Sequence, residues 1–300
     1  MSADGVIACP ACGERAPIDD RFCEVCGARL MPVADGESRG DRREIDAGFA
    51  GGLTNTGLVK ARNQDALFLE TVGETAVAVV CDGVSSSSGG DAAARVACLS
   101  AGRVLSTDRG HRGPEAAMRT AIASAQRAVL GVPWARNSDL AAPSCTFIAT
   151  LWDGRQVTVG SVGDSRAYWI DEKASHRLTD DDSWVQEQVN AGVLSEAEAE
   201  AHPDAHQITR WLGADAPDEP PAVTSFVPDG PGRIAVCTDG LWNYVSSADK
   251  FAELVRASDR DAAPLDVARS LVDHALASGG HDNVTVAIID VVPAVEGTTS

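Results

Sequence analysis

Aspartates at the ends of apolar runs are the residues of this chain best suited to binding metal ions. Two of them close apolar runs in VVCDG and IAVCTDG, a third follows a run in SVGDSR, and a fourth precedes the run VTVAIID. A fifth lies in RNQD, near the start of the main body of the chain. The five residues are Asp65, Asp82, Asp164, Asp239 and Asp282.

These carboxylates predict a divalent-cation site if the fold brings them together. Taken singly, each Asp is typical of a turn or a helix cap, and Asp153-Gly154 fits a hairpin turn. Converging carboxylates repel one another unless cations neutralise them, and oxygen-only ligands favour Mg²⁺ or Mn²⁺. The shared position at strand ends therefore favours joint metal binding over five separate turns.

Cysteines form a second group of candidate ligands. Cys9 and Cys12, and then Cys23 and Cys26, make two Cys-x-x-Cys pairs, each followed by glycine. Four thiolates complete a tetrahedral shell for one structural Zn²⁺ ion. Two disulfides or a redox Cys-x-x-Cys are the alternatives, but we expect no secretory signal and find no βαβ context for either pair. We therefore predict a zinc ribbon over residues 1–30.

The elements that must position the aspartates alternate between strand and helix patterns. Strands are expected at 76–81, 145–152, 156–162, 167–170, 233–238 and 284–292, and helices at 91–105, 114–130, 182–191 and 264–277. Short turns join the three strands between 145 and 170, which predicts an antiparallel meander. This pattern argues against a doubly wound parallel sheet and favours an α+β sandwich.

Composition divides the chain into regions. Residues 31–43 are rich in Pro, Gly and charged side chains and are interpreted as a linker. Residues 44–293 form the main body, and 294–300 are a short tail. Within the body, the acidic stretch 179–218 contains His and Pro and is interpreted as a flap or insertion over one face.

Length and charge exclude several functional classes. A chain of 300 residues can bury a sizeable core. Its net charge of −19 argues against binding to nucleic acid, which needs a basic surface. No apolar run approaches the roughly 20 residues of a membrane span. We expect a soluble cytoplasmic protein with no nucleic-acid or membrane partner.

Eight sequence blocks, in their order and spacing, resemble the metal-dependent Ser/Thr protein phosphatases of the type 2C (PPM) family. The blocks are GLVKARNQD, VVCDGVSSSSGGDAAA, SCTFIATLWDG, VGSVGDSRAYWI, LTDDDSW, ITRWLGAD, IAVCTDGLWNYV and GGHDNVTVAII. The resemblance covers about residues 46–292. It implies a four-layer αββα sandwich of two antiparallel sheets, with two Mn²⁺ or Mg²⁺ ions in a cleft at the sheet ends.

The resemblance also implies a role for each matching residue at the two ions. Asp82 would bridge both ions, and Gly83 would offer its backbone carbonyl. Asp239 and Asp282 would bind one of the ions. Asp65 would hold the other ion, often through water.

Two further residues are implied beside this pair of ions. Asp164 matches the ligand of a third, weaker ion in bacterial members, and Asn283 would orient its neighbour. A hydroxide bridging the two ions would attack the phosphorus of phosphoserine or phosphothreonine. No covalent phospho-enzyme is then needed, in keeping with the lack of a plausible cysteine nucleophile.

Three departures from the family pattern stand out. Lys60 occupies the place of the arginine that usually grips phosphate, so we predict weaker phosphate binding. Val84 follows the first Asp-Gly, where some members have a histidine that protonates the leaving group, so water would have to do so. Serines at 85–88 replace the usual glycines. They could cap the helix at 91–105 or contact the substrate, and we favour caps.

Other polar residues receive simpler interpretations. His281 lies beside a proposed ligand, but the resemblance implies carboxylates there, so we do not expect it to bind metal. His202 and His206 flank Pro203 and are interpreted as solvated or capping residues. Arg166 is expected to form a structural ion pair.

The leading function is therefore a metal-dependent phosphatase acting on phosphorylated proteins, with a cognate Ser/Thr protein kinase as its natural counterpart. Residues 1–43 hold eight acids against six arginines and no lysine, which favours a targeting or partner-binding role for the ribbon. One alternative is a catalytically inactive, phosphatase-like scaffold acting through the ribbon. Another is a zinc-dependent nucleic-acid regulator, which the net charge opposes.

Overall fold

The structure is a computed structural model that describes residues 6–8, 15–17, 42–108, 113–135, 140–200, 202–258 and 262–293. The four predicted zinc ligands, nearly all of the predicted linker and the tail lie outside these ranges. Within the predicted ribbon, β1 (Val6–Ala8) and β2 (Arg15–Pro17) form an antiparallel pair. The zinc site itself stays a prediction.

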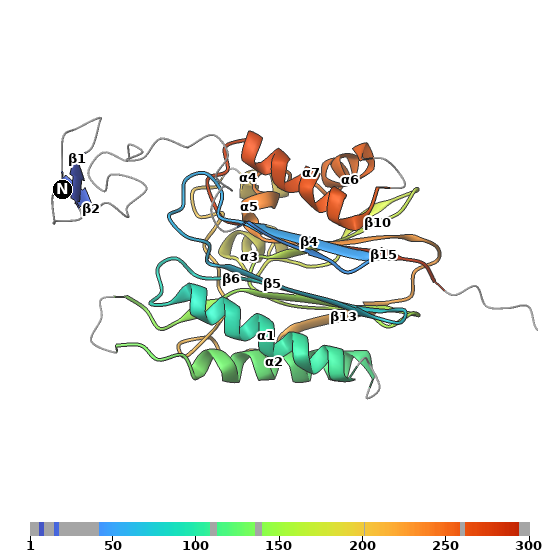
Figure 1. Ribbon diagram of the computed structural model, residues 1–300, viewed down its shortest axis with the longest axis horizontal. Helices are drawn as coiled ribbons and strands as arrows, with labels where there is room; N and C mark the ends of the chain where they lie inside the picture. The colour runs from blue at the N-terminus through green and yellow to red at the C-terminus, as the bar shows by residue number, and fades with distance from the viewer. Residues whose placement is uncertain are drawn as a thin grey trace, which may run out of the picture.

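Two antiparallel sheets face each other in the body of the chain (Figure 1). The six-stranded sheet has the order β11-β10-β14-β15-β4-β3. Its strands are β3 (Arg43–Asp46), β4 (Ala50–Asn55), β10 (Arg166–Ile170), β11 (Ser175–Arg177), β14 (Gly232–Cys237) and β15 (Val284–Val291).

The five-stranded sheet has the order β13-β9-β8-β6-β5. Its strands are β5 (Asp65–Val72), β6 (Thr75–Asp82), β8 (Phe147–Trp152), β9 (Val157–Val162) and β13 (Ala222–Phe226). A separate short pair joins β7 (Ser144–Cys145) to β12 (Leu212–Gly213).

Helices cover the outer faces of both sheets, as Figure 1 shows. Helices α1 (Gly90–Asp108) and α2 (Pro114–Leu130) pack on the five-stranded sheet. The six-stranded sheet is covered by α5 (Asp239–Trp242), α6 (Ala248–Ala257) and α7 (Pro264–Ala277). Two shorter helices, α3 (Trp184–Asn190) and α4 (Glu196–Glu200), lie in the predicted flap. This confirms the predicted α+β sandwich.

Three apolar clusters fill the interfaces between the layers. Strand β6 explains the arrangement, because its side chains alternate between two buried faces. Val77, Val79 and Cys81 pack under α1 and α2, whereas Ala76 and Val80 pack between the sheets. A strand buried on both faces is apolar at nearly every position, which is why the sequence AVAVVC shows no polar alternation.

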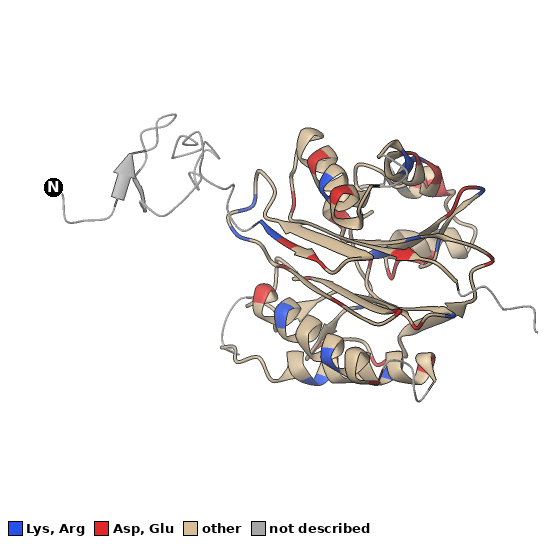
Figure 2. Cartoon of the chain, turned by 45° about the vertical axis from the view of Figure 1, so that its right-hand side comes forward, with Lys and Arg blue, Asp and Glu red and all other residues tan. Residues whose placement is uncertain are grey.

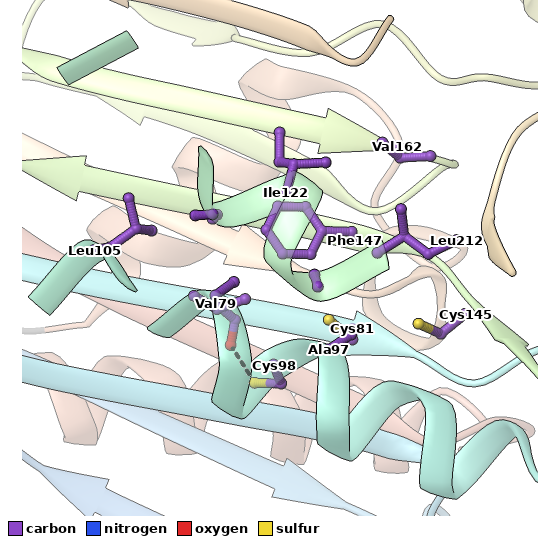
Figure 3. Close-up of a cluster of buried hydrophobic side chains, with 14 of the residues drawn as sticks. Val79, Cys81, Ala97, Cys98, Leu105, Ile122, Cys145, Phe147, Val162 and Leu212 are labelled. Carbon is purple, nitrogen blue, oxygen red and sulfur yellow. Dashed lines mark hydrogen bonds between the residues drawn. The ribbon is translucent and has the colours of Figure 1, made fainter. Parts of the chain in front are cut away.

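The cysteines of the described body are all buried and free, those being Cys81, Cys98, Cys145 and Cys237. Three of them lie in the cluster under α1, where the thiol of Cys98 contacts the carbonyl oxygen of Val79 at 3.2 Å (Figure 3). Burial raises the pKa of the Cys81 thiol well above its usual range. These side chains therefore act as small apolar core residues.

The predicted meander between residues 145 and 170 is wrong in its last strand. Strands β8 and β9 do form a hairpin, but β10 pairs with β14 and β11 in the other sheet. The chain changes sheets after Gly163, whose φ is 102°. Because β9 and β10 are buried along their whole lengths, the sequence pattern gave no sign of which sheet each strand joins.

Charged residues lie mainly on the outer helices and near the ends and edges of the strands (Figure 2). Among the described residues, no helix combines the length and apolar character needed to cross a membrane.

Candidate active site

Strand alternation points two of the predicted ligands into the space between the sheets. Leu67 and Leu69 of β5 face the other sheet, so Asp65 continues the same row at the end of the strand. Ala78 and Val80 do the same in β6, followed by Asp82. Asp65 and Asp82 are direct partners across the two strands. The same alternation that builds the core therefore brings these carboxylates together.

The opposing sheet supplies hydroxyl groups at the same end. Thr238, just beyond β14, and Thr285 in β15 lie beside each other, and the backbone N–H of Thr238 bonds to the carbonyl oxygen of Thr285 at 3.1 Å. Oγ1 of Thr238 donates to Oδ2 of Asp65 at 3.0 Å, and Oγ1 of Thr285 donates to the same oxygen at 2.7 Å. Asp65 is therefore held by both sheets. The sequence gave no reason to single out these threonines.

Buried carboxylate oxygens without hydrogen-bond donors make this cluster a candidate cation site. Among the described residues, Oδ1 of Asp65 and Oδ1 of Asp239 are buried and have no hydrogen-bond partner. Buried polar atoms usually have a partner, so an unpaired carboxylate oxygen fits a position for a cation. Hard divalent cations prefer such oxygen ligands.

Electrostatics lead to the same conclusion. Desolvation, with smaller contributions from Asp239 and Asp282, raises the pKa of Asp65 to about 7. Desolvation and the neighbouring carboxylates also raise the pKa of Asp82 and of Asp164 well above the usual range, and the pKa of Asp239 is raised in the same way. Burial and mutual repulsion therefore disfavour the ionised forms of these carboxyl groups unless cations offset their charge.

The carboxylates do not form a closed cage. In the described ranges, no three His, Cys, Asp or Glu side chains are gathered closely enough to hold one ion by themselves. The fit of divalent cations therefore rests on the chemistry of the donors and on the unpaired oxygens of Asp65 and Asp239. Water and backbone carbonyls would have to complete any coordination shell.

The pairs Asp82-Gly83 and Asp239-Gly240 need glycine because another segment of backbone lies very close to each of them. A Cβ atom at Gly240 would lie 1.8 Å from the carbonyl oxygen of Asn283, and one at Gly83 would lie 2.4 Å from the carbonyl carbon of Gly90. No other residue fits without a backbone shift. These pairs therefore serve tight packing around the carboxylates, unlike Asp153-Gly154, whose turn is open.

Asn283 connects the loop before β5 to the start of β15. Its Oδ1 accepts from the backbone N–H of Gln64 at 2.8 Å, and its Nδ2 donates to the carbonyl oxygens of Thr56 and Arg62 at 2.8 and 3.0 Å. Its own N–H donates to Oδ1 of Asp282 at 2.7 Å. These contacts fix the loop that carries Lys60, and the orienting role of Asn283 stays a prediction.

Lys60 contacts a proposed metal ligand. Its Nζ lies 3.0 Å from Oδ1 of Asp282 and donates to Oγ of Ser85 at 3.2 Å. Ser85 in turn donates to Oε1 of Gln64 at 3.3 Å, so this serine belongs to the site and is not a helix cap. Lys60 is therefore at the site, as expected, but is engaged with a carboxylate.

Asp164 lies beside a structural network. Its carbonyl oxygen accepts from Nε1 of Trp242 at 2.9 Å, and the guanidinium of Arg166 stacks 3.7 Å from the centre of the Trp242 ring. Arg166 also forms the predicted ion pair, with Asp181 at 2.6 Å. Asp182 bonds Arg210 at 2.9 Å and the N–H of Gly163 at 2.9 Å. The acidic run 180–182 therefore anchors the flap, and Ser183 caps α3.

A cavity of about 1030 Å³ opens beside Asp239 and Asp282. Its other walls come from the predicted flap, including α3 and α4, and from α5 and the start of α6. His206 lines it from the flap side, with its ring 6.1 Å from that of Trp242. His281 lines it as well, and Nδ1 of His281 is 3.1 Å from the hydroxyl of Tyr244. His206 is exposed, as the sequence-based interpretation expected, but the sequence gave no sign that it lines the same cavity as Asp239 and Asp282.

Comparisons with known proteins agree with this geometry. A model of the protein phosphatase 2C family matches residues 59–275. The match spans most of the sequence, and the chain belongs to the protein phosphatase 2C family.

Among its relatives, the serine/threonine protein phosphatase PstP of Mycobacterium tuberculosis is 28% identical over 246 residues, covering 82% of this chain and 45% of PstP. The serine/threonine phosphatase stp of Listeria innocua is 31% identical over 153 residues, covering 51% of this chain and 58% of that protein. The chain thus spans about half the length of these curated relatives.

Solved structures show the same fold. The crystal structure of M. tuberculosis PstP aligns with a TM-score of 0.66 and 26% identity, over 84% of this chain and 99% of that one. The PstP catalytic domain in complex with two manganese ions aligns with a TM-score of 0.66 and 24% identity, over 83% of this chain and 98% of that one.

Proposed function

We propose that this protein is a metal-dependent phosphatase that hydrolyses phosphoserine and phosphothreonine in proteins. The observation that carries the proposal is the carboxylate cluster at the sheet ends, with raised pKa values and two unpaired buried oxygens. The relatives named as serine/threonine phosphatases support it.

The residues that would hold two Mn²⁺ or Mg²⁺ ions are those of the cluster. Asp82 would serve both ions, and the backbone carbonyl of Gly83 would be a further ligand. Asp239 and Asp282 would bind one ion, and Asp65 would hold the other. Asp164 is the candidate for a third ion. When bound, such ions make water a nucleophile near neutral pH and neutralise phosphate charge.

The chain's own residues have distinct tasks in this proposal. Lys60 would move from Asp282 to a phosphate oxygen, which the flexibility of its side chain permits. Thr238 and Thr285 keep Asp65 oriented. The neighbouring cavity gives room for the polypeptide on either side of the phosphorylated residue. The alternative of an inactive scaffold gains no support, since all five aspartates are present.

The partners belong to the proposal as well. Phosphorylated proteins are the proposed substrates, and a Ser/Thr kinase is the proposed counterpart. The ribbon over residues 1–30 is proposed to bind one Zn²⁺ ion and to target the enzyme or bind a partner. Metal analysis of the purified chain should find one zinc per chain, lost when Cys9 and Cys12 are replaced by serine.

The decisive experiment measures phosphate release from a phosphothreonine peptide with Mn²⁺. Wild type is compared with Asp82→Asn and Asp239→Asn, whose amides match the protonated acids in shape and should leave the fold intact. We expect activity in wild type and its loss in both variants. A chelator is a poor substitute because it also removes zinc. An inactive wild type that is folded and binds Mn²⁺ would overturn the proposal.

A further inference from the structure

Hydrolysis of a phosphoserine or phosphothreonine leaves an alkoxide, which needs a proton as it departs. The need for a proton donor in this site rests on the proposed function. Val84, the residue after Asp82-Gly83, carries an apolar side chain that cannot donate a proton. A donor must therefore come from elsewhere in the site, or from water.

The position of the cavity tells which side the leaving group occupies. Lys60 contacts Asp282 and Ser85 and is not among the residues that line the cavity. The cavity lies next to Asp239 and Asp282, and its volume of about 1030 Å³ is large enough for a polypeptide segment. A phosphate held by Lys60 at the carboxylates thus directs its leaving oxygen toward the cavity walls.

Two histidines line these walls, and they differ in their contacts. Nδ1 of His281 is 3.1 Å from the hydroxyl of Tyr244, and that hydroxyl also accepts from the backbone N–H of His281 at 3.0 Å. His281 is thus tied to Tyr244. His206 is exposed on the flap and touches the cavity beside Trp242, so solvent can return a proton to its ring after each turnover.

The shared cavity places His206 near the proposed reacting centre, because His206, Asp239 and Asp282 all line it. Arg166, which is stacked on Trp242, and Asp181, which is paired with Arg166, line the same cavity.

We propose that His206 is a catalytic residue that protonates the leaving serine or threonine oxygen. The oxygen of the attacking water forms a bond to phosphorus and gives up a proton to solvent, and the bond from phosphorus to the side-chain oxygen breaks. The electron pair of the broken bond stays on the side-chain oxygen, which takes a proton from a ring N–H of His206. The neutral imidazole then regains a proton from solvent.

The test compares a substrate that needs the proton with one that does not. A phosphothreonine peptide leaves as an alkoxide, whereas 4-nitrophenyl phosphate leaves as a stable phenolate. In full-length protein with Mn²⁺, His206→Gln should lower kcat on the peptide about 100-fold and kcat on the aryl phosphate less than about fivefold. The aryl phosphate also shows that the variant is folded and loaded with metal.

Two matched variants complete the design. His202→Gln lies on the same flap, where the ring of His202 packs 5.0 Å from Trp184, and should change both rates less than about twofold. His281→Gln should show no selective loss on the peptide. Three outcomes would each overturn the assignment to His206. His206→Gln could lose activity equally on both substrates or on neither, or His281→Gln could show the selective loss on the peptide. A wild type inactive on both substrates would instead contradict the proposed function.

Discussion

The carboxylate cluster lies beside the flap anchor, which is the set of ion pairs that Asp181 and Asp182 form with arginines. The two regions balance their charges in opposite ways. In the cluster, Asp65, Asp82 and Asp239 face one another, and two of their buried oxygens have no donor. In the anchor, Arg166 pairs with Asp181, and Arg210 pairs with Asp182. The cluster is incomplete without cations, whereas the anchor is complete as it stands.

This difference predicts opposite responses to the loss of a charge. Removing an anchor charge leaves a buried partner unpaired and should destabilise the fold. Removing a cluster charge relieves repulsion and should stabilise the metal-free fold while abolishing its use of metal. Charge in the anchor maintains structure, and charge in the cluster maintains function at a cost to stability.

The largest expected effect concerns the anchor. Arg166→Met should lower the free energy of unfolding by about 3 kcal/mol, because it strands Asp181 in a site where both side chains are only 7% exposed. Urea denaturation measures this. The control Arg42→Met breaks surface pairs with Glu44 and Asp273 and should cost less than about 1 kcal/mol. Equal losses in the two variants would remove the distinction.

The cluster should respond in the opposite direction. Without Mn²⁺ or Mg²⁺ at pH 7.5, Asp239→Asn should raise the free energy of unfolding, because burial and the neighbouring carboxylates disfavour the charge of Asp239 and the amide carries none. Adding Mn²⁺ should stabilise wild type much more than this variant. The control Asp229→Asn removes an exposed charge. Its free energy of unfolding and its stabilisation by Mn²⁺ should both stay near those of wild type. A destabilised Asp239→Asn would contradict the proposed repulsion.

The cluster could be predicted from the sequence because it depends on strand alternation and on local motifs. Asp82 and Asp239 each follow a strand that the apolar pattern reveals, and their close-packed glycines stand next to them. Their family resemblance then assigned roles that spacing alone left open. Helices 114–130 and 264–277 were also correct, each beginning at a proline.

The anchor and the cavity could not be predicted because they depend on contacts between distant segments. Nothing local pairs Arg210 with Asp182 or places His206 beside Trp242. Strands β4 and β5 were missed because polar residues and glycines interrupt their apolar pattern, as in AGGLTN. The sheet change before β10 was missed because both strands are fully buried.

The pH dependence of stability tests the cluster as a whole. The folded-state pKa of Asp65, about 7, lies above the usual value near 3.9, so the folded protein binds the proton more tightly than the unfolded chain. This stabilisation is fully present below pH 4 and is lost as pH rises through 7. Protein dialysed free of Mn²⁺ and Mg²⁺ should therefore show a Tm that falls between pH 5 and 7.5, with a shallower fall in Asp65→Asn. Adding Mn²⁺ to wild type should also raise Tm more at pH 7.5 than at pH 5.5.

The smallest expected effect concerns Lys60, because Asp282 of the cluster and the phosphate of the substrate compete for its ammonium group. Its contact with Asp282 is about one-third exposed, with side chains 30% and 34% accessible, so the pair contributes less than about 1 kcal/mol. Lys60→Met should therefore raise Mn²⁺ affinity about threefold by calorimetry, because Asp282 is released, and should raise KM for the phosphopeptide. Lys60→Arg should lower KM, since a guanidinium grips phosphate with two hydrogen bonds. Lys250→Met, on the exposed face of α6, serves as the control with unchanged affinity and KM. An unchanged KM in both Lys60 variants would show that this lysine serves only Asp282, and that the phosphate is held by the ions alone.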